Sequence, residues 1–260
     1  MIRRKLLISY TLALGFSILA FSSCTKIEKK DALFQASTIS ALSQGMYHGD
    51  MSFQELNKYG DFGLGTFNDL DGEMIILDGV FYQAKTDGYL YPVSLQETKT
   101  PFSEVTFFRS NLTKTVTRQM TQTELKEMIT GLLRSKNIFY AIRIVGHFPY
   151  IKIRSVPAQK RPYPKLDDVV KDQAVFEFHQ AEGTIVGFWC PEYVKKVNVP
   201  GYHFHFISRD KKRGGHVLDF IITNSTIDID EKTSLDVVLP ETEDFYMIDT
   251  SEESQNLAEK

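Results

Sequence analysis

The stretch that decides the fold is GYHFHFISRDKKRGGHVL, residues 201–218. Aromatic residues alternate with histidines in its first half, and a charged turn ending in two glycines leads into a second apolar run. This alternation predicts a β-strand, because successive side chains of a strand point to opposite faces of the sheet. The whole stretch therefore predicts a β-hairpin.

Three of the six histidines in the chain lie in this hairpin. His203 and His205 are two positions apart, so both imidazoles point to one face of their strand. His216 opens the second strand, and several registers, including direct pairing with His205, would bring it to the same face. A slip of one residue would separate them, and the sequence leaves this register open.

Three imidazoles on one face leave an open position on a bound metal ion, which is typical of catalytic rather than structural sites. Imidazole suits zinc, and also iron, copper or nickel. We expect Zn²⁺ at His203, His205 and His216, with another divalent transition metal as the alternative. The other interpretation is that the three are ordinary polar residues of the hairpin. The remaining histidines are interpreted as structural or surface groups: His48, His147 and His179.

The rest of the chain predicts a β-sheet-dominated α+β fold, with mixed and antiparallel sheets in two packed subdomains and a few short helices. Asp-Gly pairs between apolar runs over residues 62–93 predict antiparallel hairpins. A capping box at Thr121–Glu124 begins a helix expected over residues 121–135. The 260 residues carry a formal net charge of −3, and this lack of basic excess predicts no nucleic-acid partner.

We expect subdomains over residues 25–160 and 161–260, because two prolines in Arg161–Pro164 break regular structure. Further elements are expected as follows: a helix over 33–42, strands over 138–145 and 150–156 joined by a turn at 146–149, a hairpin of strands 175–178 and 184–189 around Glu182-Gly183, and a tail from Glu241 whose composition alone predicts disorder.

The N-terminal residues 1–24 have the pattern of a lipoprotein-type signal peptide. A positive segment, Arg3–Lys5, precedes an apolar segment that ends at Phe21. In this interpretation the protein is exported, and a lipid on Cys24 anchors it in the periplasm or at the cell surface. An uncleaved anchor and an ordinary signal peptide are the alternatives. Cys190 then lacks a disulfide partner in the chain and is expected to be a buried small residue.

Several segments together carry a resemblance to a known family. They are GLGTFNDLDGEM (63–74), FYAIR (139–143), RSVP (154–157), RPYP (161–164), VPGYHFHFI (199–207) and GGHVL (214–218). With these segments in this order, the chain resembles bacterial α-acetolactate decarboxylase over nearly all of its length after residue 24.

The resemblance implies roles for particular residues. It implies that the three hairpin histidines are zinc ligands, that Glu73 is an active-site glutamate and that Arg154 is an active-site arginine. The family also uses a glutamate near its C-terminus, for which Glu259 is the best counterpart, with Glu252 and Glu253 as competitors. Without the resemblance, Glu73 and Arg154 would be read as solvent-facing strand residues.

The implied reaction is metal-dependent decarboxylation of 2-acetolactate to acetoin and CO₂, with the metal as Lewis acid for the enediolate. Arg154 would hold the departing carboxylate, and Glu73 or Glu259 would deliver the proton. We expect a homodimer. The alternatives are an exported lipoprotein that binds zinc or copper without catalysis, and a related lyase or hydrolase acting on another small hydroxy or keto acid.

Overall fold

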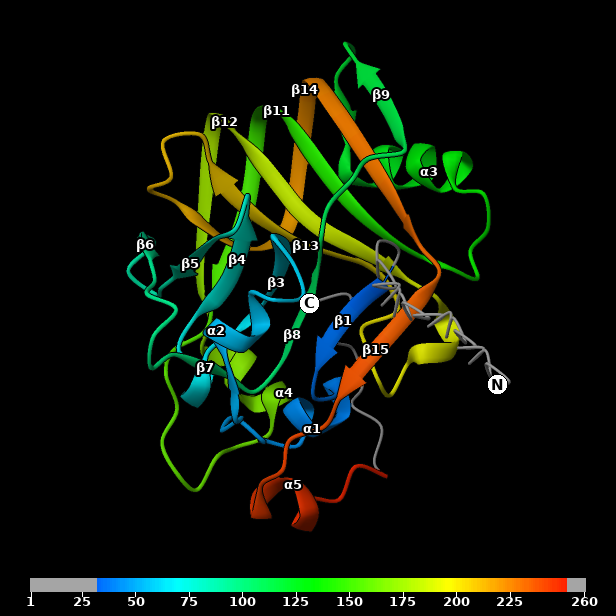
Figure 1. Cartoon of the computed structure of the whole chain (residues 1–260). Coiled ribbons are helices and arrows are strands. Elements are labelled where there is room, and N and C mark those ends of the chain that lie inside the picture. The colour runs from blue at the N-terminus through cyan, green and yellow to red at the C-terminus, as the bar shows by residue number, and fades with distance from the viewer. Residues whose placement is uncertain (1–31, 252–260) are drawn as a thin grey trace, which may run out of the picture.

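The computed structural model describes residues 32–251 and consists mainly of β-strands (Figure 1). A seven-stranded sheet contains, in spatial order, β15 (Ser234–Val238), β1 (Ala32–Ala36), β8 (Ser103–Thr106), β3 (Phe62–Thr66), β4 (Glu73–Leu77), β5 (Val80–Ala84) and β6 (Leu90–Pro92). A six-stranded sheet contains β10 (Met120–Thr121), β14 (Gly214–Lys232), β11 (Phe139–Ser155), β12 (Ala174–Cys190) and β13 (Gly201–Ser208), with β9 (Leu112–Val116) paired to β14. Two short strands pair separately: β2 (Met51–Ser52) and β7 (Lys99–Thr100).

The helices are few and short. They are α1 (Ile39–Ser43), α2 (Phe53–Leu56), α3 (Gln122–Leu132), α4 (Leu166–Val169) and α5 (Glu243–Met247), with 3₁₀ turns η1 (Asn68–Leu70), η2 (Val170–Asp172) and η3 (Glu192–Val194). The seven-stranded sheet is mixed, because β1 and β15 run parallel, whereas the six-stranded sheet is antiparallel. The predicted sheet-dominated α+β fold is confirmed.

The predicted meander after residue 62 is confirmed as β3 to β6. Its tightest turn is Asp78-Gly79 between β4 and β5, where both residues have positive φ, 52° and 76°. Positive φ at both central positions is the requirement of a type I′ hairpin turn, which explains why this pair stands there.

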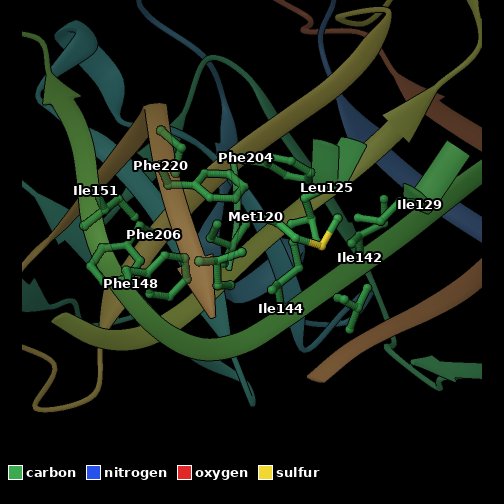
Figure 2. Close-up of a cluster of buried hydrophobic side chains, with 14 of the residues drawn as sticks. Met120, Leu125, Ile129, Ile142, Ile144, Phe148, Ile151, Phe204, Phe206 and Phe220 are labelled. Carbon is green, nitrogen blue, oxygen red and sulfur yellow. The ribbon is translucent and has the colours of Figure 1, made fainter. Parts of the chain in front are cut away.

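The six-stranded sheet curls on itself. β13 pairs with β12 on one side and with β14 on the other, so β14, β11, β12 and β13 close into a ring. The concave face holds a cluster of buried side chains that includes Ile142, Phe148, Phe204, Phe206 and Phe220 (Figure 2). The opposite face packs on the seven-stranded sheet through a second cluster.

Helix α3 covers the concave cluster, as its apolar spacing predicts. Its N-cap Thr121 accepts a hydrogen bond from the Glu124 backbone N–H, and the Glu124 carboxylate accepts one from the Thr121 N–H, which completes the predicted capping box. Leu125 and Ile129 on its inner face are fully buried in the concave cluster.

Two predicted interruptions are wrong, because β11 and β12 are continuous strands of 17 residues each. His147 and Phe148 of β11 pair with Glu182 and Ala181 of β12, so neither strand reverses there. A Cβ on Gly183 would lie 2.4 Å from the Phe206 ring. This glycine therefore allows close packing rather than a turn.

The helix predicted over residues 33–42 is also wrong in its first half. Residues 32–36 form β1, which is held between β8 and β15, and only Ile39–Ser43 is helical. Pairing with strands about 70 and 200 positions away leaves no local signal in the sequence. The tail from Glu241, predicted disordered on composition, contains α5, whose N-cap Thr242 accepts a hydrogen bond from the Phe245 N–H at 3.3 Å.

Strands from both sides of residue 160 share each of the two large sheets. β15 joins the N-terminal strands in the seven-stranded sheet, and β11 pairs with β12 in the other. The predicted boundary lies in the connection between β11 and β12. The signal segment, with Cys24, lies outside the described residues. No helix within residues 32–251 is long and apolar enough to span a membrane.

Candidate metal centre

The predicted histidine hairpin forms, with β13 and β14 as its strands. Its turn closes by a hydrogen bond from the Ser208 N–H to the Arg213 carbonyl at 2.9 Å, and the Asp210 carboxylate accepts from the Lys212 N–H at 3.1 Å. His205 lies directly opposite His216, which settles the register that the sequence left open. Phe204 and Phe206 enter the concave cluster, so His203 and His205, which alternate with them, face the seven-stranded sheet.

Arg154 joins the histidines from the neighbouring strand. It lies directly opposite His216 on β11, so His205, His216 and Arg154 form one row across three strands. The face of β11 that enters the concave cluster changes from even-numbered residues, up to Phe148, to odd-numbered residues, Ile151 and beyond. This change across Pro149 places Arg154 on the face of the histidines rather than in the cluster.

The three imidazoles lie close enough to hold one metal ion. One nitrogen from each of His203, His205 and His216 lies within 4.8 Å of the others. His205 Nε2 is 3.3 Å from His216 Nδ1. A tetrahedral zinc ion with Zn–N bonds of about 2.0–2.1 Å separates its ligand nitrogens by about 3.3 to 3.4 Å, so this pair fits such an ion.

A backbone contact fixes the His205 ring. Its Nδ1 lies 2.8 Å from the carbonyl oxygen of Met74 on β4. A carbonyl oxygen only accepts hydrogen bonds, so the ring nitrogen that contacts it must be the protonated one. Nδ1 therefore carries the proton, and the Nε2 lone pair points toward His216. Hydrogen bonding of the second ring nitrogen is the usual way in which proteins orient a metal-binding imidazole.

Glu73 enters the site from the seven-stranded sheet. It opens β4 directly after Gly72, which has a φ of 84° and where a Cβ would lie 2.3 Å from the Ala84 carbonyl oxygen. The turn therefore requires glycine. Glu73 Oε2 is 3.6 Å from His205 Nε2, and Oε1 is 3.9 Å from Arg154 Nη1.

Burial dominates the electrostatics of these groups. It raises the pKa of Glu73 above its ordinary value, although Arg154 and His203 act in the opposite direction. Burial also holds the pKa of His205 and His216 well below 6.5, and nearby positive groups add to the effect. Both imidazoles are therefore neutral and available as ligands at neutral pH.

Arg154 is a buried cation with spare hydrogen-bonding capacity. Its exposed fraction is 7%, and its Nε has no hydrogen-bond partner within residues 32–251. A buried unpaired donor on a guanidinium is costly unless an anion binds it, and its planar fork matches a carboxylate. The site can therefore take a carboxylate beside the imidazoles.

These side chains line a cavity of about 50 Å³. Besides the charged and imidazole groups, it is lined by Thr66, Gly65 and a set of apolar side chains: Ile39, Leu42, Leu70, Phe102, Val156, Leu166 and Val199. The small volume and the apolar wall favour a ligand of few atoms with short alkyl groups.

One residue of this site is missing from the sequence analysis. Glu104 on β8 is fully buried, and its Oε1 lies 3.4 Å from His203 Nδ1. The available signal was that Glu104 is the one charged residue of the run Ser103–Phe108, which reads as a buried strand. An acidic residue in such a strand is seldom fully buried without a partner, so its presence indicates a specific contact.

The other predicted residues divide into two groups. Glu259 and its competitors Glu252 and Glu253 lie outside the described residues, so their roles remain predictions. Cys190 is buried, as predicted, at 1% exposure. Among the remaining histidines, His48 and His179 are exposed and His147 is half-buried, and none of them lines the cavity.

Three imidazoles, a carboxyl group of raised pKa and a buried guanidinium in one small cavity define a candidate transition-metal site that is open to an anionic ligand. The sequence model of the alpha-acetolactate decarboxylase family matches residues 33–252. The chain belongs to this family and is thus an enzyme of the carboxy-lyase class.

Individual relatives agree with this assignment. The chain is 47% identical over 229 residues to alpha-acetolactate decarboxylase of Methanosarcina mazei, covering 88% of this chain and 78% of the relative. It is 40% identical over 230 residues to the Bacillus subtilis enzyme, covering 88% and 90%. The crystal structure of the enzyme from B. subtilis strain 168 superposes with a TM-score of 0.83 at 41% identity, covering 85% of this chain and 94% of that one.

Proposed function

We propose that the chain converts 2-acetolactate to acetoin and CO₂ in a metal-dependent reaction. The observation that carries this proposal is the meeting of His203, His205 and His216 with Glu73 and Arg154 in one cavity of about 50 Å³. Family membership supplies the substrate class, and the donor set supports the metal.

The three histidines would hold the metal, and Zn²⁺ is the expected ion. When bound, the ion supplies a Lewis acid for the negative charge that develops on the substrate oxygens. The fit rests on the 3.3 Å separation of the His205 and His216 nitrogens and on the low pKa of both rings.

Arg154 would bind the carboxylate that leaves as CO₂. Its guanidinium is buried and has an unpaired Nε, so a carboxylate satisfies a donor that otherwise has no partner. Because Arg154 lies beside His216 in the same row, the carboxylate is held next to the imidazoles. This fixes the orientation of the C–C bond that breaks.

Glu73 would supply the proton. Cleavage of the C–C bond leaves its electron pair on the former ketone as an enediolate, and a proton must then reach the carbon that lost CO₂. A raised pKa keeps the Glu73 carboxyl group protonated further toward neutral pH, which suits a general acid. Glu259 remains the other candidate donor.

Assays of metal-loaded and metal-stripped protein with racemic acetolactate test the proposal. We expect acetoin to form only with the metal-loaded protein. A protein that merely stores zinc or copper would release no acetoin. A lyase for another acid would also leave acetolactate intact, but it would act on alternative small hydroxy-keto acids in a parallel screen.

We also propose that the protein is exported and anchored through a lipid on Cys24. The support is the sequence pattern of residues 1–24 alone. Mass spectrometry of the mature protein is expected to find an acylated Cys24 at the N-terminus. An intact Met1 or a mature chain that begins at another residue would contradict the anchor.

A further inference from the structure

A buried carboxylate stands directly behind one of the proposed metal ligands. Glu104 on β8 is fully buried, and its Oε1 is 3.4 Å from His203 Nδ1. Within the described part of the chain, neither of these two atoms has a hydrogen-bond partner. Two unsatisfied buried atoms, one of them on a carboxylate, therefore face each other.

The other oxygen of Glu104 is held by a chain of buried amides. Glu104 Oε2 accepts from Asn198 Nδ2 at 2.8 Å, and the same amide group donates to Gln35 Oε1 at 2.8 Å. The Val199 N–H donates to Asn198 Oδ1 at 2.6 Å, and Gln35 Nε2 donates to the Val197 carbonyl at 2.6 Å. These contacts fix which atom of each amide is donor and which is acceptor.

This chain of contacts spans several parts of the fold. Gln35 lies on β1, Glu104 on β8, Asn198 in the connection before β13, and His203 on β13. Gln35, Glu104 and Asn198 are each 0% exposed, so water does not compete for these hydrogen bonds. A buried polar network of this kind is more than packing requires, since apolar side chains would fill the same space at lower cost.

We infer that Glu104 is a positioning residue for His203, accepting the Nδ1–H so that the Nε2 lone pair faces the metal. The inference rests on the proposed function, because it takes His203 as a ligand. A carboxylate that holds the second ring nitrogen fixes the tautomer and the ring orientation, and it raises the basicity of the ligating nitrogen.

Glu104→Gln tests this with little change in shape. If the Gln oxygen faces His203, the Gln amide meets the amide of Asn198 donor to donor. If the oxygen faces Asn198, the Gln amide instead meets His203 Nδ1, which must give up its proton and place it on Nε2. Either arrangement loosens His203 as a ligand, because the neighbouring amides cannot turn to adapt.

We expect Glu104→Gln to weaken zinc binding by about 10- to 100-fold, which is the usual effect of losing a hydrogen-bond partner of a ligand. Competition with a chromogenic chelator measures this. Asp230→Asn is the matched control, because Asp230 on β14 is also a buried carboxylate but does not line the cavity. It binds Lys232 Nζ at 2.7 Å and accepts a hydrogen bond from the Arg109 N–H at 2.6 Å. The zinc affinity of the Asp230→Asn protein should equal that of the wild type.

Nitrogen-15 NMR of labelled histidine in the metal-free wild-type protein reads the tautomer directly, and it does not depend on any variant folding. The His203 signal is assigned by its absence from His203→Asn. A proton on Nδ1 supports the inference, and a neutral ring with its proton on Nε2 overturns it. Wild-type protein that fails to bind zinc refutes the proposed function instead, whereas equal zinc affinity in wild type and Glu104→Gln refutes the positioning role alone.

Discussion

Replacing Arg154 with alanine isolates the group that would bind the substrate carboxylate. The guanidinium is 7% exposed, so water does not readily replace it when it is removed. Loss of one partner of a buried charge pair costs about 2 to 5 kcal/mol, and a middle value of about 2.7 to 4 kcal/mol corresponds to a factor of roughly 10² to 10³. We therefore expect kcat/KM for acetoin formation to fall by about 10²- to 10³-fold, while zinc content and fold stay unchanged.

A second readout follows from the neighbour of Arg154. The guanidinium lies 3.9 Å from Glu73 and lowers the pKa of that carboxyl group. Without the guanidinium, Glu73 keeps its proton to higher pH. If Glu73 is the proton donor, the loss of activity at alkaline pH should move to higher pH in Arg154→Ala.

Arg143→Ala is the matched control, since Arg143 lies on the same strand and pairs with Asp228 at 2.9 Å on the partly exposed side. We expect its kcat/KM to match the wild type and its free energy of unfolding to drop by about 1 to 3 kcal/mol, because the buried Asp228 carboxylate loses its cation. The assay is steady-state acetoin formation from racemic acetolactate, with zinc measured on the same samples. A zinc-loaded Arg154→Ala protein with wild-type kcat/KM would refute carboxylate binding by this residue.

Four further predictions concern other parts of the molecule. His205→Ala should lose zinc on dialysis together with all activity, and full turnover by this variant after chelation would exclude the metal site. Thr121→Ala removes the N-cap of α3, so urea unfolding should show a loss of about 1 kcal/mol with kcat unchanged; an unchanged midpoint would contradict the capping role. In the metal-free folded protein the pKa values of His205 and His216 are depressed, so below pH 6.5 the unfolded chain binds up to two more protons at these residues. The raised pKa of Glu73 has the opposite effect, because at this residue the folded protein binds up to one more proton than the unfolded chain. The free energy of unfolding should therefore fall on acidification through the unfolded histidine pKa of about 6.5, because two imidazoles outweigh one carboxyl group, and a rise would contradict this sign. Truncation after Asn256 should lower kcat if Glu259 acts in the site, and unchanged kinetics would exclude it.

The sequence contained most of the histidine site. The alternation of aromatic residues and histidines predicted that His203 and His205 lie on one face of a strand. The charged turn before His216 predicted where the second strand begins, so the hairpin was predictable from local pattern. Its register was not, because several pairings satisfy the same alternation. The roles of Glu73 and Arg154 came from family resemblance, since their neighbours across the sheets have no local signal.

The long strands were only partly predictable. Gly146 and Pro149 in β11 and Gly183 in β12 resemble turn signals, but they serve packing and a change of face within continuous strands. That change of face decides which side of the sheet Arg154 occupies. The uncharged run around Glu104 marked the residue but not its role, because its partners Asn198 and His203 are about a hundred positions away and meet it only when the two sheets pack.

Titration of zinc into metal-free protein, with the initial rate of acetoin formation as readout, tests the metal-dependent decarboxylase most directly. We predict no turnover without metal and a linear rise that reaches a plateau at one equivalent of zinc per chain, as three imidazoles in one cavity require. Full activity in the metal-free protein, or no acetoin at any zinc concentration, would contradict this function.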